Sequence, residues 1–317
     1  MTSNSDAGFW SGARLMVGFR RFAFIAFAFA AWMGAHGALA QKSSSAPLLP
    51  VMGPIGTPAE RTDQVEKDRI AGVSAFERGD FATATAYFQR VRRVDSTNDE
   101  GMFLLGRAYL ATGQTALAAD EFTSAIALND KVEKYFYARA KAEMRLGKFA
   151  AAVVDYNRDL ELRDGKGSPI FFQARGDAYL GNGQTDQAIK DYGLVVAGGG
   201  DARLAYLHRG IALARSLDLE HALQDLNTAE AAGKSANALD FDTYFYRGIV
   251  EQLGGDKAGA LRDYKAAQAF KSDHKPQAEC LVILAGKQKH GLFGGGGPPK
   301  RCRGFDAVKA LLLPPES

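Results

Sequence analysis

Side chains of the kinds that perform catalysis are few in this sequence, and they do not occur at useful spacings. None of the five histidines has a second metal ligand at a typical spacing: His36, His208, His221, His274 and His290. The sequence also lacks the motifs G-x-S-x-G, G-x-x-x-x-G-K-[ST] and H-E-x-x-H. We therefore predict that the protein is not an enzyme and has no metal site and no cofactor.

Charged side chains that recur in pairs give more information about the structure than the histidines do. Four arginines are each followed, at one fixed distance, by an aspartate: Arg139 and Asp155, Arg175 and Asp191, Arg209 and Asp225, and Arg247 and Asp263. A guanidinium and a carboxylate can form a bidentate ion pair when two helices bring them together. We predict a structural ladder of Arg–Asp pairs, each worth about 0.2–1 kcal/mol if exposed. A functional stripe of charge is the alternative.

These pairs belong to a repeat of about 34 residues that runs through most of the chain. Six units align with two short insertions: 65–98, 99–132, 133–166, 169–202, 203–236 and 241–274. In the second unit, Gly106 stands at position 8, Ala118 at position 20 and Phe122 at position 24, and the other units carry similar residues there. Small residues at positions 8 and 20 let two antiparallel helices approach closely. Glycine at position 15 of five units ends the first helix, because glycine accepts the left-handed conformation.

The period and the pattern x-L-G-x-x-Y…A-x-x-x-F resemble the tetratricopeptide repeat over residues 65–274. This resemblance implies an all-α fold, a right-handed superhelical solenoid of antiparallel helix pairs. Each unit buries its apolar face against the next one, because a single helix pair cannot bury it alone. The sequence departs from the family at Asp159, which replaces a small residue at position 27, and by lacking the usual proline near position 32.

The segment before the repeats carries a targeting pattern. Residues 1–40 contain Arg20 and Arg21, then an apolar run, then small residues at Ala38 and Ala40. This is the layout of a secretory signal peptide, which we expect to be cleaved after Ala40. An uncleaved membrane anchor is the alternative, and the start is either Met1 or Met16. The protein would then be periplasmic or secreted.

The other flanking segments have distinct compositions. Residues 41–61 are rich in Pro, Ser and Gly and predict a linker, so that the solenoid region is 62–274. Residues 275–290 predict a helix that caps the last unit, and 291–317 predict a flexible, basic, Gly/Pro-rich tail with a short apolar segment. Cys280 and Cys302 can form a disulfide in an oxidising compartment. Two unpaired cysteines are the alternative.

The resemblance also implies where a partner binds. In this fold the first helix of each unit lines a concave groove, with positions 2, 5, 9 and 12 facing inward. We expect contacts from Arg69, Phe103, Arg107, Tyr137, Lys141, Gln173, Leu207, Ile211 and Phe245. Neighbouring inward positions include Lys134, Asp177 and Asp242. The first half of this set is basic and aromatic, and the second half is mainly apolar. Position 9 is never Asn, so a clamp for a C-terminal carboxylate is not expected.

Composition limits the function further. With 46% hydrophobic and 24% charged residues the chain should fold, and its net charge of +3 is too small to indicate a nucleic-acid partner. We predict a non-catalytic scaffold of the bacterial envelope that binds another protein or an extended peptide. Membrane contact is expected only through an uncleaved signal sequence. The alternative is a structural component of an envelope secretion or polysaccharide-export assembly. A solenoid with exposed ends can also form homo-oligomers.

Overall fold

The computed structural model describes residues 56–233, 238–270 and 278–282 of the 317-residue chain. These residues form helices α2 to α13, and none of them lies in a strand. Within the same ranges no helix is both long enough and apolar enough to cross a membrane. The predicted signal peptide, most of the linker and the basic tail lie outside the described residues.

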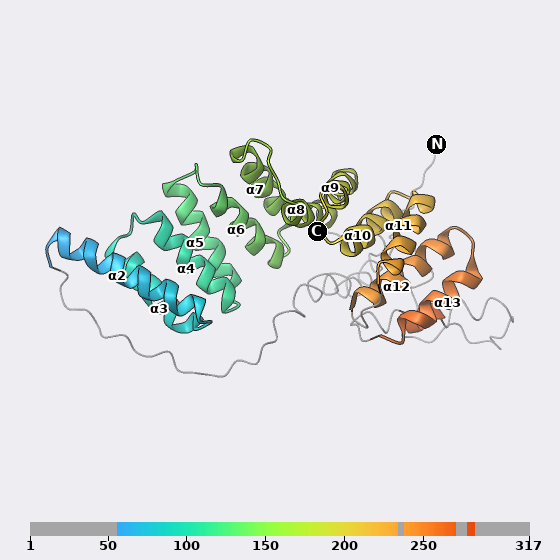
Figure 1. Cartoon of the computed structure of the whole chain (residues 1–317), viewed down its shortest axis with the longest axis horizontal. Helices are drawn as coiled ribbons and strands as arrows, with labels where there is room; N and C mark the ends of the chain where they lie inside the picture. The colour runs from blue at the N-terminus through green and yellow to red at the C-terminus, as the bar shows by residue number, and fades with distance from the viewer. Residues whose placement is uncertain (1–55, 234–237, 271–277, 283–317) are drawn as a thin grey trace, which may run out of the picture.

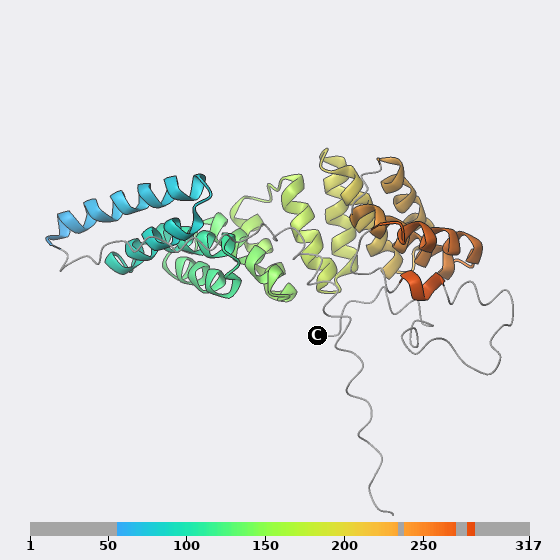
Figure 2. The ribbon, with the colours of Figure 1, turned by 90° about the horizontal axis from the view of Figure 1, so that it is seen from below.

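Each predicted unit is a pair of antiparallel helices. The first helices are α2 (Pro58–Glu77), α4 (Asp99–Ala111), α6 (Glu133–Arg145), α8 (Pro169–Gly181), α10 (Ala202–Arg215) and α12 (Ala238–Leu253). The second helices are α3 (Phe81–Val94), α5 (Thr115–Leu128), α7 (Phe149–Leu162), α9 (Thr185–Ala197), α11 (Leu219–Ala231) and α13 (Lys257–Ala267). The pairs follow one another along an elongated body, from α2 at one end to α13 at the other (Figures 1 and 2). The prediction of an all-α solenoid is therefore confirmed.

Helix α2 begins earlier than the sequence pattern predicted. It starts at Pro58, inside the segment expected to be a linker. Thr57 and Glu60 form a capping box, in which the Thr57 hydroxyl accepts from the Glu60 amide and the Glu60 carboxylate accepts from the Thr57 amide at 2.6 Å. Proline is favoured in the first turn of a helix, where its missing N–H costs nothing.

The turn inside each pair requires a residue with positive φ. In five units this residue is glycine, with φ between 73° and 92°: Gly79, Gly113, Gly147, Gly183 and Gly255. In the fifth unit Leu217 takes this place with φ 64°. The left-handed conformation brings a Cβ close to the following carbonyl oxygen, so Leu217 is a strained exception.

Position 8 is small because an aromatic ring from the second helix lies directly on it. A Cβ added to Gly106 would lie 2.5 Å from Cε1 of Phe122, and one added to Gly176 would lie 2.8 Å from Cε1 of Tyr192. Phe122 and Tyr192 are both 0% exposed. The ring therefore fills the space inside its own helix pair.

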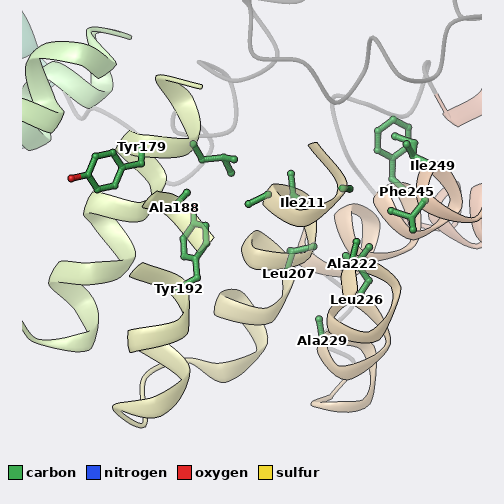
Figure 3. Close-up of a cluster of buried hydrophobic side chains, with 14 of the residues drawn as sticks. Tyr179, Ala188, Tyr192, Leu207, Ile211, Ala222, Leu226, Ala229, Phe245 and Ile249 are labelled. Carbon is green, nitrogen blue, oxygen red and sulfur yellow. The ribbon is translucent and has the colours of Figure 1, made fainter. Parts of the chain in front are cut away.

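Two clusters of buried apolar side chains meet at α6. The first extends from Ala75 to Ala142, and the second from Ala140 to Leu281. Figure 3 shows part of the second cluster, in which Leu207 and Leu226 of the fifth unit lie with Phe245 of the sixth. Residues 278–282 are helical and add Ala278 and Leu281 to this core, so the described part of the predicted capping helix does cover the last unit.

The first helices lie on the inner side of the curve. They lie against one another, α2 with α4, α4 with α6, α8 with α10 and α10 with α12. No pair of second helices within the described ranges shares a comparable contact. When helix pairs touch on one side of a stack and diverge on the other side, the stack bends toward the side on which they touch. We call this first-helix side the inner face.

Candidate binding face

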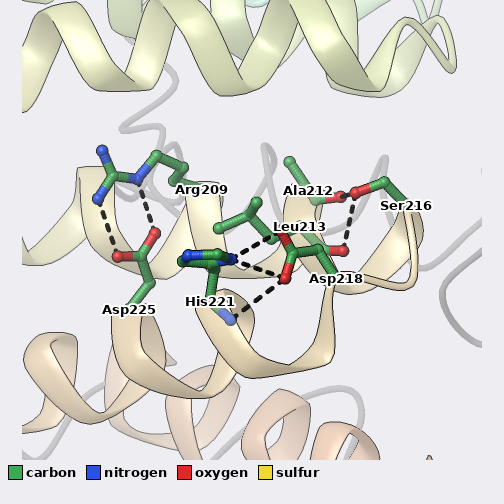
Figure 4. Close-up of polar contacts among 7 residues, drawn as sticks. All are labelled: Arg209, Ala212, Leu213, Ser216, Asp218, His221 and Asp225. Atoms are coloured by element: carbon green, nitrogen blue, oxygen red, sulfur yellow. Dashed lines mark hydrogen bonds and ion pairs between the residues drawn. The ribbon is translucent and has the colours of Figure 1, made fainter.

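All four predicted Arg–Asp pairs are present, and each joins the first and second helix of its unit. Arg175 donates from Nε and Nη2 to the two carboxylate oxygens of Asp191, both at 2.8 Å. Figure 4 shows the equivalent pair of Arg209 and Asp225, at 2.7 and 2.9 Å. The other two pairs are Arg139 with Asp155 and Arg247 with Asp263. The four aspartates are only 3–6% exposed. The energy expected for an exposed pair therefore does not apply to this ladder.

Three of these arginines also reach the preceding unit. Their Nη1 atoms donate to a side-chain oxygen at 3.0–3.3 Å, which belongs to Thr123, Asn157 or Asn227. These acceptors share position 25 of the repeat. The residue at this position before Arg209 is Gly193, which has no side chain to accept a bond. The ladder thus links units as well as helices, and the polar residues at position 25 were the sequence signal for this link.

On the inner face of units two and three, three cations lie on aromatic rings. The guanidinium of Arg107 is 4.9 Å from the ring centroid of Phe76 and 5.7 Å from that of Phe103. Lys134 Nζ is 5.1 Å from the Phe103 centroid, and Lys141 Nζ is 5.6 Å from the Tyr137 centroid. All three cations are exposed, and in the described part of the chain none of them forms an ion pair. They are therefore available to anionic groups of a partner.

The other predicted contact residues are less available. Arg69 is bonded to Glu66 of its own helix through Nε at 2.8 Å and Nη2 at 2.7 Å. Phe103 is 8% exposed and packs between Phe122 and Tyr135. Three apolar residues expected to face a partner lie in the core, at 1–7% exposure: Leu207, Ile211 and Phe245. These side chains support the inner face from below and contribute little of its surface.

Units four to six carry a polar cluster on the same face. Asp177 Oδ1 accepts from the Tyr192 hydroxyl at 2.8 Å and from Gln173 Nε2 at 3.0 Å, and it lies 2.7 Å from His208 Nδ1. Such a short contact between a carboxylate oxygen and a ring nitrogen requires a proton between them. We infer that Nδ1 of His208 carries this proton. Asp242 on α12 is close enough for its charge to interact with His208.

The sequence located the members of this cluster but not their association. The repeat register placed Gln173, Asp177 and Asp242 on inward positions, whereas His208 was considered only as a metal ligand. Within the described ranges no group of three or more His, Cys, Asp or Glu side chains is suited to hold a metal ion. Cys280 is 3% exposed and disulfide-bonded. Cys302 lies outside the described residues, so the pairing of these two cysteines stays a prediction.

Comparison with known proteins agrees with this architecture. The tetratricopeptide repeat model matches residues 71–133 and 174–237, and no curated protein matches the chain. The crystal structure of PilW, described as a type IV pilus biogenesis factor, is 14% identical, with a TM-score of 0.54, over 68% of this chain and 98% of PilW. YrrB, described as a repeat protein with an unusual peptide-binding site, is 15% identical, with a TM-score of 0.51, over 63% of this chain and 97% of YrrB.

A third structure, pilF of Pseudomonas aeruginosa, is 12% identical, with a TM-score of 0.50, over 66% of this chain and 92% of its own. At such identities the likeness concerns the fold alone. Proteins with this repeat generally act as non-catalytic scaffolds that bind other proteins or peptides. The registered helix pairs, the glycine under the aromatic ring and the two matched stretches together show that this chain is a tetratricopeptide repeat protein.

Proposed function

We propose that the protein is an interaction scaffold of the bacterial envelope that holds an extended segment of a partner protein along its inner face. Anionic groups of this segment would meet the cations of units two and three, and apolar groups would contact the rings beside them. The chain itself would perform no reaction. Its contribution would be a preformed surface, which binds at a lower ordering cost than a flexible one.

The observation that carries this proposal is the set of exposed cations that have no ion-pair partner among the described residues, Arg107, Lys134 and Lys141. The ladder arginines differ from them, because each is held in a bidentate pair with a buried aspartate. A cation over a ring keeps its charge directed outward while its stem is held in place. The rings themselves are fixed, since Phe103 packs against Phe122 and Tyr137 against Phe171.

The envelope location is supported by residues 1–40, whose charged, apolar and small-residue segments follow the order of a signal peptide. Mass spectrometry of the protein from the periplasmic fraction tests this point. Cleavage after Ala40 predicts a chain that begins at Gln41. An intact N-terminus in the membrane fraction would support the anchor instead.

The inner face is tested by capture of partners from the envelope fraction with a crosslinker. One variant carries Arg107→Ala, Lys134→Ala and Lys141→Ala. A matched control carries Lys190→Ala, Lys257→Ala and Lys265→Ala, which remove the same charge from exposed positions of second helices. Both variants should keep the helicity and melting temperature of the unmodified chain.

The proposal predicts that at least one partner is captured by the unmodified chain and by the control but is lost from the inner-face variant. The binding should also weaken as salt rises, because these charges are exposed. Retention of all partners by the inner-face variant would contradict the proposal. The identity of the captured proteins also decides the alternative, because a component of a secretion or polysaccharide-export assembly should capture other parts of that assembly.

A further inference from the structure

We propose that the inner face of units four to six receives a lysine or arginine side chain of the bound segment, with Asp242 as its counter-charge. This inference rests on the proposed function, because the partner segment must lie along the inner face to reach Asp242. It extends that function by assigning a chemical preference to the half of the face where the sequence suggested only apolar contacts.

Asp242 is buried without a partner. It is 9% exposed, and it makes no hydrogen bond or ion pair within the described part of the chain. Other buried aspartates do have a cation beside them. Each aspartate of the ladder pairs with an arginine, and Asp68 Oδ2 lies 3.1 Å from Arg90 Nε. Burial of an unpaired carboxylate is costly, and a cation with hydrogen-bond donors would remove most of this cost.

The carboxylate of Asp242 can be reached from outside. Several buried side-chain atoms without a hydrogen bond are sealed from solvent, among them Asp159 Oδ2 and Gln173 Oε1. The oxygens of Asp242 are not among these sealed atoms, although they have no partner in the described residues. The small exposed fraction of Asp242 therefore includes the atoms that would bind a cation.

The neighbouring polar groups favour a donor over an acceptor. Asp177 adds a second carboxylate to this part of the face, and its Oδ1 already accepts hydrogen bonds from Tyr192 and Gln173. His208 directs Nδ1–H toward Asp177. An approaching carboxylate would be repelled by Asp177 and Asp242, whereas an ammonium or guanidinium group would be attracted by both.

Arg215, whose charge acts on two tyrosines of this region, forms no ion pair with Asp242. Arg215 donates from Nη1 to the carbonyl oxygen of Leu180 at 2.8 Å. Its charge acts on the hydroxyl groups of Tyr192 and Tyr246, whereas the charge of His208 acts on Asp242. No lysine or arginine of the described residues therefore pairs with Asp242.

The protonation of Asp242 provides an independent readout. Burial raises the pKa of Asp242 to about 7, and His208 opposes this rise. The other titratable groups that face the cluster are Asp177, Tyr192, Tyr246 and Arg215. Because a bound cation requires ionised Asp242, affinity for it should increase from pH 6 to pH 8 by up to about tenfold.

The test uses the mature chain and pools of 12-residue peptides with blocked ends. One central position is fixed as Lys, Arg or Gln, and the remaining positions are drawn from Ala, Leu, Phe, Ser, Asp and Glu. Affinities are measured by fluorescence anisotropy for the unmodified chain, for Asp242→Asn and for Asp186→Asn. The last variant is a matched control, because Asp186 is exposed on the second helix α9.

The unmodified chain should bind the Lys and Arg pools at least about tenfold more tightly than the Gln pool, since a charged hydrogen bond to a buried group is worth about 1.5–3 kcal/mol. Asp242→Asn should abolish this preference and its pH dependence and still bind the Gln pool normally. Asp186→Asn should change neither. Equal binding of all pools, or a preference that survives Asp242→Asn, would overturn the inference.

Failure of the inference differs from failure of the proposed function. If the pools bind without preference and Arg107→Ala with Lys141→Ala weakens them, the inner face binds peptides and only the role of Asp242 is wrong. If no pool binds the unmodified chain, both the inner-face function and the role of Asp242 are overturned.

Discussion

Loss of a ladder arginine should destabilise the solenoid far more than loss of an exposed ion pair. In the fourth unit, Arg175 bonds both oxygens of Asp191 at 2.8 Å and Asn157 Oδ1 at 3.2 Å. The Asp191 side chain is 4% exposed and that of Arg175 is 13% exposed. Arg175→Ala therefore leaves a buried carboxylate without a counter-charge.

Removal of one partner from a buried pair costs about 3–5 kcal/mol. Because the arginine is slightly exposed, water can reach Asp191 after truncation, and we expect a loss of about 3 kcal/mol in the free energy of unfolding. Adding Asp191→Asn removes the unpaired charge and should recover about 1–2 kcal/mol of this loss. The exposed pair Lys67–Asp63 serves as a control. Its side chains are 67% and 64% exposed, so Lys67→Ala should cost less than about 1 kcal/mol.

Stacked repeats unfold in more than one step, so the assay must report on the affected units. Hydrogen exchange of the amides in α8 and α9 gives the free energy of opening of the fourth unit. Urea unfolding followed by circular dichroism gives the free energy of unfolding of the chain. If Arg175→Ala costs no more than Lys67→Ala, or if Asp191→Asn gives no recovery, the ladder does not stabilise the fold as argued.

Three further predictions concern two exceptions within the repeat and two partly buried glutamates. Gly193→Asn should stabilise the chain by about 1 kcal/mol, because it supplies Arg209 with the acceptor that position 25 gives the other arginines; in urea unfolding, an equal gain in an Arg209→Lys background would contradict this. Leu217→Gly should raise the free energy of unfolding by about 1 kcal/mol because it relieves the φ of 64°, and Leu217→Ala, which keeps the Cβ, should give no gain in the same urea assay. Burial raises the pKa of Glu143 and Glu251 to about 7 from 4.5, so the folded state binds these protons more tightly. Their contribution to stability should fall as pH rises from about 4.5 to above 7, and Glu143→Gln with Glu251→Gln should flatten this part of the pH profile of urea unfolding.

The fold was predictable because its determinants lie within one unit. Gly106, Ala118 and Phe122 are a few turns apart and fix how the two helices of the unit approach each other. The Arg–Asp ladder was predictable for the same reason, since Arg and Asp appear together in the same units and face each other across one helix pair. In both cases the same residue types recur in several units, which distinguishes the pattern from a chance arrangement.

The exposure of the inner face was not predictable in the same way. Leu207 and Phe245 occupy inward positions, but whether they are exposed depends on how closely the first helices of neighbouring units pack. The contact of Asp177 with His208 joins two units, and Asp242 comes from a third. Such associations depend on the stacking geometry, which the residues of any single unit do not determine.

The central claim is that a partner lies on the inner face, and site-specific photocrosslinking tests it most directly. A photoreactive amino acid is placed at Lys141 on the inner face or at Lys190 on the second helix α9, both exposed. After irradiation of the envelope fraction, the account predicts a specific protein adduct from position 141 that a matched probe at position 190 does not form. An adduct from position 190 alone, or equal adducts from both positions, would contradict the account.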